Sequence, residues 1–124
     1  ITEKGGAISN VSSESVALDF PMLSLSQCTK AGLERFTLTP SRNLEPAGIR
    51  VTTVRAGPMY EEGKGSTWDP QVGMEFYQKC VAAGIDLRAR PISHVNSVTD
   101  VFRALIDLPP DVRVTHASIE ARHP

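Results

Sequence analysis

A serine and a lysine stand four residues apart in the stretch SQCTKAGL, where Ser26 precedes Lys30. On a helix this spacing places both side chains on one face. An ammonium beside a hydroxyl is also the arrangement of a serine–lysine nucleophile pair. A hydrolase would further need donors for an oxyanion, and the sequence indicates no such pocket, so a solvated helix face is the simpler interpretation. A further hydroxyl, Ser13, stands 13 residues before Ser26.

The first half of the chain predicts two strands joined by a long helix. Residues 7–12 form a short apolar run typical of a buried strand, and the β-branched run 49–54 predicts a second strand. Between them, amphipathic spacing over 26–45 predicts a helix that bends or breaks at Pro40. Residues 55–68 carry glycines, a proline and charges, which predicts a loop.

The second half predicts two helices and a strand. A helix is expected over 69–83, with Asp69 as its N-cap, and a further helix is expected to begin at a cap formed by Asn96 or Ser97. The apolar face of the latter comprises Val98, Val101, Phe102, Leu105 and Ile106. An alternating edge strand is expected over 112–122, so the element order predicts a parallel α/β layered sheet.

Composition excludes several function classes. The 124 residues suit one domain, and a net charge of -1 with 13 scattered basic residues predicts no nucleic-acid partner and no anionic membrane surface. No apolar run approaches the ~20 residues of a spanning helix, and the opening ITEKGG lacks a signal-peptide profile. We therefore expect a cytoplasmic protein.

The cysteines and histidines predict no metal site. Cys28 and Cys80 lie far apart without a CxxC pattern, which also argues against a disulfide framework. His94, His116 and His123 share no ligand spacing and are expected at the surface or at a sheet edge.

Four blocks, in order, resemble the short-chain dehydrogenase/reductase family. AISNVSS at 7–13 resembles the strand end that carries the family's catalytic serine, and SQCTKAGL resembles its Y-x-x-x-K block with Ser26 in place of the tyrosine. LEPAGIRVTTVRAGPM resembles the following strand and Pro-Gly loop, and the tail from Ser97 resembles the last helix and strand. The family also places its serine about 13 residues before its tyrosine, as Ser13 stands before Ser26.

The resemblance implies the carboxyl-terminal portion of a Rossmann-like doubly wound parallel sheet, about three strands with flanking helices. It implies an oxidoreductase that moves hydride between NAD or NADP and a small carbonyl or alcohol. The catalytic positions that it implies are Ser13, Ser26 and Lys30. The cofactor-binding positions that it implies are Lys30, Ala56, Gly57, Pro58 and Met59.

Two departures from the family qualify this expectation. An aliphatic hydroxyl at Ser26 is a far weaker acid than a phenol and is shorter by about one aromatic ring, so Ser26 cannot replace the tyrosine. The family's glycine-rich pyrophosphate turn, its selector between NAD and NADP and its catalytic asparagine all precede the matching region. Because Ile1 is not an initiator methionine, we expect residues 1–124 to be one domain that lacks the amino-terminal half, natural or cut, and to be inactive alone.

The alternative is a non-catalytic interaction protein of the same fold. The helix over 26–45 could pack in a homo-oligomer, as the corresponding helix does in the family, or the chain could associate with its missing half. The aromatic and apolar residues after the loop could line a substrate pocket or pack together: they are Trp68, Met74, Phe76 and Tyr77. Tyr60 has the wrong offset from Lys30 to replace the family's acid.

Overall fold

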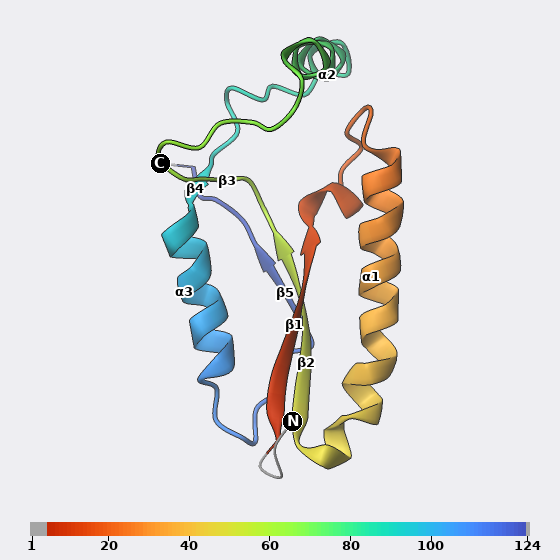
Figure 1. Cartoon of the computed structure of the whole chain (residues 1–124), viewed down its shortest axis with the longest axis vertical. Coiled ribbons are helices and arrows are strands. Elements are labelled where there is room, and N and C mark those ends of the chain that lie inside the picture. The colour runs from red at the N-terminus through yellow and green to blue at the C-terminus, as the bar shows by residue number, and fades with distance from the viewer. Residues whose placement is uncertain (1–4, 124) are drawn as a thin grey trace.

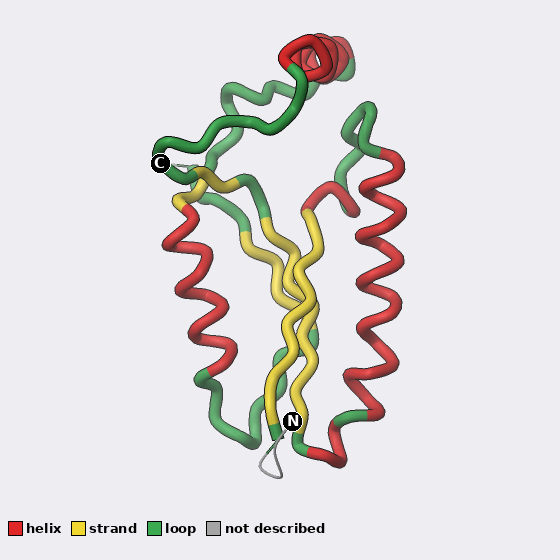
Figure 2. Tube along the Cα trace, viewed as in Figure 1, coloured by secondary structure: helices red, strands yellow, loops and turns green. Residues whose placement is uncertain are grey.

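The computed structural model describes residues 5–123, in which a parallel sheet lies between two long helices (Figure 1). The sheet order is β1 (Gly6–Ser13), β2 (Ile49–Ala56) and β5 (His116–Ile119), and both pairings are parallel. Figure 2 shows the strands running side by side between helical layers. The prediction of a parallel α/β sheet with flanking helices is confirmed.

Strand β2 forms the centre of the core. It pairs with β1 on one side and β5 on the other, and Val51 and Val54 are 1% and 0% exposed. β-branched side chains fit such a doubly covered strand well. The strand is two residues longer than the predicted 49–54, because ladder pairing continues through Ala56.

The helix α1 (Ser24–Asn43) covers one face of the sheet through polar contacts. Thr37 is 2% exposed, and its Oγ1 accepts a hydrogen bond of 2.9 Å from Asn10 Nδ2 of β1. The same hydroxyl donates to the carbonyl of Leu33 at 2.7 Å. This buried hydroxyl therefore both donates and accepts a hydrogen bond, and its bond to Asn10 fixes the position of the helix along the strand.

The sequence predicted that this helix would bend or break at Pro40, and the break does not occur. Helix α1 runs unbroken to Asn43 and begins at Ser24, two residues earlier than predicted. Pro40 lies in the last turn, where its carbonyl still accepts a bond from Leu44 N at 2.9 Å. The missing proline N–H removes a single bond near the end of the helix, so few contacts depend on it.

The helix α3 (Val95–Ile106) covers the other face of the sheet, and its predicted cap is wrong. The N-cap is His94, whose Nδ1 accepts a bond from Asn96 N at 3.0 Å, rather than Asn96 or Ser97. Imidazole nitrogen can cap a helix as hydroxyl and carboxylate oxygens do, a use that the usual cap preferences do not signal.

The segment between β2 and α3 holds short elements. These are β3 (Met59–Tyr60), α2 (Pro70–Ala82) and β4 (Ser93–His94), and β3 pairs with β4 in parallel. The predicted loop over 55–68 therefore contains the end of β2 and all of β3. Helix α2 is confirmed with its predicted cap, because Asp69 Oδ1 accepts from Gln71 N at 2.8 Å.

The last strand is shorter than expected. Ladder pairing covers His116–Ile119 rather than 112–122, although β5 is an edge strand as predicted. Before it, the carbonyl of Val114 accepts from Thr52 Oγ1 at 2.7 Å instead of a strand partner. Within residues 5–123, none of the helices combines the length and hydropathy that crossing a bilayer requires.

Arg50 of β2 holds the segment that follows α3. Its guanidinium donates to the carbonyls of Ile106 and Leu108 at 3.0 and 2.9 Å, and to two further carbonyls at 3.3 and 3.5 Å. Ile106 is the last residue of α3 and the other three carbonyls follow it, so Arg50 caps the end of the helix and holds the segment after it.

Replacing Arg50 should therefore destabilise the fold. We expect Arg50→Met to lower the free energy of unfolding by about 2–3 kcal/mol, since charged hydrogen bonds to several carbonyls are lost. Urea unfolding followed by circular dichroism measures this change. Arg35→Met, at an exposed position on α1, is the matched control and should change stability little. Equal effects of the two variants would contradict the capping role.

Candidate functional site

The carboxyl ends of the three sheet strands lie at one edge of the sheet. Ser13 is opposite Ala56, and Ala56 is opposite Ile119, so the strand ends form one row. In open parallel sheets, ligands bind in the crevice outside the carboxyl ends of the strands. This row is therefore where a site is expected.

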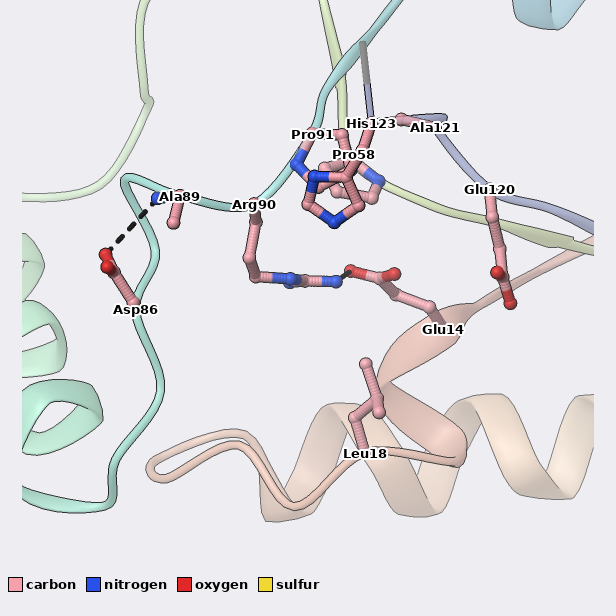
Figure 3. A pocket seen from close by; sticks show the side chains of 10 residues that line it. All are labelled: Glu14, Leu18, Pro58, Asp86, Ala89, Arg90, Pro91, Glu120, Ala121 and His123. Carbon is pink, nitrogen blue, oxygen red and sulfur yellow. Dashed lines mark hydrogen bonds and ion pairs between the residues drawn. The ribbon is translucent and has the colours of Figure 1, made fainter.

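A pocket of about 520 Å³ lies beside this row (Figure 3). Its walls come from residues that follow each strand, namely Glu14, Pro58 and Glu120, and from the loop between α2 and β4. Leu18 and Pro91 give it apolar surface, whereas the carboxylates supply polar groups. A largely apolar wall with a few polar groups is typical of a small-molecule site.

An ion pair ties the α2–β4 loop to the end of β1. Arg90 Nη2 donates to Glu14 Oε1 at 2.7 Å, and the guanidinium carbon lies 5.1 Å from the centroid of the Phe20 ring. Both charged side chains are part-buried, at 28% and 20% exposure. The pair and the cation–π contact thus close one side of the pocket.

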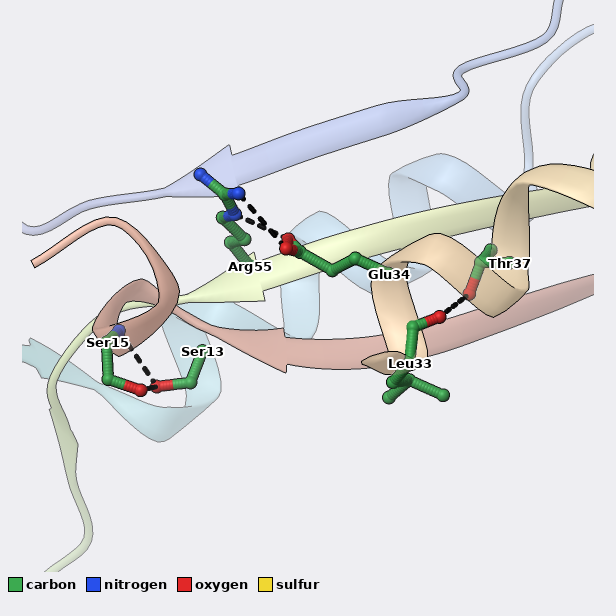
Figure 4. Close-up of polar contacts among 6 residues, drawn as sticks. All are labelled: Ser13, Ser15, Leu33, Glu34, Thr37 and Arg55. Carbon is green, nitrogen blue, oxygen red and sulfur yellow. Dashed lines mark hydrogen bonds and ion pairs between the residues drawn. The ribbon is translucent and has the colours of Figure 1, made fainter. Parts of the chain in front are cut away.

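Ser13 terminates β1 and caps the short 3-10 helix η1 (Glu14–Val16). Its Oγ accepts bonds from Ser15 N at 3.2 Å and from Ser15 Oγ at 3.0 Å (Figure 4). Ser13 is half-buried, whereas Ser15 is buried at 5% exposure. The structure therefore places Ser13 at the row of strand ends with a defined side-chain orientation.

Ser26 and Lys30 do not form the serine–lysine pair. Lys30 Nζ donates to the carbonyl of Val11 in β1 at 3.0 Å. Ser26 is exposed, and within residues 5–123 its hydroxyl makes no hydrogen bond. Lys30 thus lies against the strand that ends in Ser13, whereas Ser26 faces solvent.

Gln27 is a structural residue of this site that sequence reasoning missed. Its Nε2 donates to the carbonyls of Ser15 and Leu18, at 2.9 and 2.6 Å. These bonds tie the first turns of α1 to the segment after β1. The available signal was the amide side chain of Gln27 between Ser26 and Lys30. Its partners are 9 and 12 residues away along the chain, and no sequence spacing predicts such a contact.

Within the segment Ala56–Met59, Pro58 lines the pocket, and backbone bonds engage Gly57 N and the Pro58 carbonyl. Gly57 N donates to the carbonyl of Ile119 at 2.9 Å, and the carbonyl of Pro58 accepts from Ser93 N at 3.1 Å. A Cβ at Gly57 would lie 2.7 Å from that Ile119 oxygen, so the close approach to β5 requires glycine.

The aromatic residues after this loop mostly pack against one another. The Trp68 and Phe76 rings lie 5.2 Å apart, edge to face, and Phe76 lies 6.3 Å from Phe20. Met74 and Tyr77 line a different, largely apolar pocket on α2. None of the four residues lines the pocket at the strand ends.

The described residues contain no cluster of His, Cys, Asp and Glu side chains that could hold a metal ion. Both ring nitrogens of His94 are engaged, Nδ1 by Asn96 N and Nε2 by Glu62 at 2.7 Å. Cys28 and Cys80 are free, and burial raises the pKa of the Cys80 thiol.

A part-buried ion pair lies between α1 and the carboxyl end of β2. Arg55 donates to the Glu34 carboxylate through Nε and Nη2, the latter at 3.0 Å (Figure 4). The hydrogen bonds and charge of Arg55 hold the pKa of Glu34 below its ordinary value, against the opposing effect of burial. The pair fixes α1 near the row of strand ends.

Solved structures of short-chain dehydrogenases and reductases are similar to this chain. A short-chain dehydrogenase from Mycobacterium paratuberculosis bound to NAD has a TM-score of 0.75 at 17% identity, with 95% of this chain and 45% of that chain covered. An acetoin dehydrogenase from Salmonella typhimurium has a TM-score of 0.67 at 17% identity, with 94% and 44% covered. A serine dehydrogenase from Escherichia coli has a TM-score of 0.62 at 17% identity, with 92% and 39% covered.

The chain thus has a portion of the short-chain dehydrogenase/reductase fold, and it spans less than half the length of each of these proteins. The resemblance noted in the sequence is confirmed at the level of the fold. No family model and no curated protein matches the sequence.

The Glu34–Arg55 pair should make stability depend on pH. Because the pKa of Glu34 is lowered by folding, its contribution is complete above the ordinary value of 4.5 and is lost as the pH falls through the lowered folded value. We expect Glu34→Gln to cost about 1.5–3 kcal/mol at pH 7 and much less at pH 3. Urea unfolding at both pH values measures this difference.

The control for this prediction is Glu75→Gln, which removes an exposed i,i+4 pair with Lys79 on α2. That variant should change stability by less than about 0.5 kcal/mol at either pH. A cost of Glu34→Gln that is independent of pH would contradict the assignment.

Proposed function

We propose that this chain is part of an NAD(P)-dependent oxidoreductase that acts on a small carbonyl or alcohol. One observation carries the proposal: Ser13 stands in the row of strand ends beside the pocket, with Lys30 held against the same strand. The fold supports the assignment, since similar structures include reductases and dehydrogenases with NAD or NADP bound.

Each implied residue has a role that its surroundings allow. The Ser13 hydroxyl donates a hydrogen bond to the oxygen of the substrate. Lys30 is close enough to the end of β1 to exchange its bond to the Val11 carbonyl for a ribose hydroxyl. Pro58 and Met59 present apolar surface to a nicotinamide ring, and the bound cofactor supplies or accepts the hydride.

The proton step lacks its usual donor. Ser26 offers an alcohol whose acidity is far below that of a phenol, so it contributes little to moving a proton at the carbonyl oxygen. We infer that turnover by the natural sequence is slow. We also infer that the complete site needs a further segment, which would pair with β1 along the edge opposite β2.

A second function has support from the surface of α1. Leu25 and Phe36 are 82% and 66% exposed on this helix, which suits a non-catalytic protein that associates through it, with another copy or another chain. On this alternative the polar contacts around Ser13 serve only the fold.

Restoring a phenol at position 26 should raise activity. In a protein that joins this chain to the missing amino-terminal half, we expect Ser26→Tyr to increase NADPH- or NADH-dependent reduction of small carbonyl compounds by about 100-fold, because a general acid is returned one helical turn before Lys30. Absorbance at 340 nm measures the rate. Cys28→Tyr adds the same ring at an exposed position of the same helix and should give no gain. Equal rates for both variants and the natural chain would favour the non-catalytic alternative.

The nicotinamide half of the cofactor should bind weakly at the strand ends. We expect titration with reduced nicotinamide mononucleotide to shift the amide NMR signals of Ser13, Gly57 and Met59, since these residues lie at the row of strand ends and in the loop that follows β2. Lys30→Met should weaken these shifts severalfold, whereas Lys79→Met on α2 should not.

Adenosine monophosphate is the ligand control for this titration, because it lacks the nicotinamide ring. The same pattern of shifts with both nucleotides would contradict a nicotinamide site. Shifts confined to α1 that grow with protein concentration would instead indicate self-association.

A further inference from the structure

We propose that Ser15 is a positioning residue that leaves the hydroxyl proton of Ser13 free for a substrate oxygen. The inference rests on the proposed function, because Ser13 is the hydroxyl offered to the substrate there. It concerns a residue that contacts Ser13 but does not line the pocket at the strand ends.

The burial of the two hydroxyls sets the direction of the bond between them. Ser15 is 5% exposed, and within residues 5–123 the only hydrogen-bond partner of its hydroxyl is Ser13 Oγ at 3.0 Å. A buried O–H that donated nowhere would lose its hydrogen bond to water without replacement. Ser13 is half-buried, so its proton can still bond to water, and the Ser15 hydroxyl therefore donates while the Ser13 oxygen accepts.

A second bond completes the arrangement. Ser15 N–H also donates to Ser13 Oγ, at 3.2 Å. A hydroxyl oxygen has two acceptor lone pairs and one donor proton. With both lone pairs engaged, the remaining capacity of Ser13 is to donate, and the two incoming bonds polarise its O–H and strengthen it as a donor.

This geometry defines the chemistry that Ser13 can recognise. A carbonyl, alcohol or alkoxide oxygen can accept the Ser13 proton, whereas an N–H group finds no free lone pair on the Ser13 oxygen. Ser15 therefore makes the site selective for a hydrogen-bond acceptor at the reacting position.

Gln27 keeps this arrangement in register with α1. Its Nε2 donates to the carbonyl of Ser15 at 2.9 Å and to that of Leu18 at 2.6 Å. The turn that carries Ser15 is thereby fixed to the helix that carries Ser26 and Lys30. The orientation of Ser13 follows from Ser15 and Gln27 and does not require the side chain at position 26.

Hydroxyl exchange measured by NMR tests the direction of the bond. With serine labelled at ¹³Cβ, in equal parts of H₂O and D₂O, a slowly exchanging hydroxyl gives two Cβ signals and a rapidly exchanging one gives a single averaged signal. We expect two signals for Ser15 and one for Ser13, with exposed Ser97 as the rapid control. Ser13→Ala and Ser15→Ala assign the signals. Slow exchange at Ser13 with rapid exchange at Ser15 would overturn the proposal, as would rapid exchange at both.

Kinetics of the Ser26→Tyr protein joined to the missing amino-terminal half give the second readout. Ser15→Ala should lower kcat about 3- to 10-fold with little change in KM, because the donor strength of Ser13 matters most as charge develops on the oxygen. Ser15→Thr keeps the hydroxyl and should retain most of kcat, and circular dichroism checks that both variants fold. An unchanged kcat in Ser15→Ala would overturn the proposal.

The two readouts separate the two claims. Slow exchange at Ser15 in a protein without reductase activity would defeat the oxidoreductase function while upholding the direction of the bond. Reductase activity with rapid exchange at Ser15 would do the reverse.

Discussion

The parallel pairing of β1, β2 and β5 is the constraint on which the rest of the structure depends. β2 is bonded on both sides, and its valines have almost no exposed surface, so its register determines where both neighbours end. Parallel strands present their carboxyl ends at one edge, and the shared row of Ser13, Ala56 and Ile119 follows from this. Strand pairing alone therefore brings segments that are far apart in the chain together beside one pocket.

Helix α1 is attached to the sheet by several polar contacts. The Asn10–Thr37 bond, the Glu34–Arg55 pair and the Lys30 bond to the Val11 carbonyl lie along its inner side. Such bonds have strict geometry, so the helix cannot slide along the strand without leaving buried groups unsatisfied. Meanwhile the outer side of the helix keeps large exposed side chains such as Phe36.

Periodicity and blocks of residues predicted the three strands of the larger sheet, the three α-helices and their order, because these follow from local patterns of burial. The two-residue strands β3 and β4 were not predicted. The failures came from contacts between distant residues or from an unusual use of a side chain. Proline does disrupt helices, but Pro40 lies too near the end of α1 to break it. His94 caps α3 with a ring nitrogen, which the usual cap residues do not predict. The structure brings Ser13 and Lys30, two positions that the family resemblance implied, to the same strand, but sequence spacing could not reveal that Gln27 reaches the turn after β1.

Under the proposed function, the position of Gln27 explains how the site would keep its shape without a phenol at position 26. The side chain at 26 is exposed and makes no hydrogen bond among residues 5–123, so a serine there removes no contact that holds the fold. Orientation at the end of β1 comes instead from the neighbouring amide and from Ser15, which is buried. Under the proposed function, the acid and the orientation of Ser13 would therefore depend on different residues, so a substitution at position 26 would leave that orientation in place.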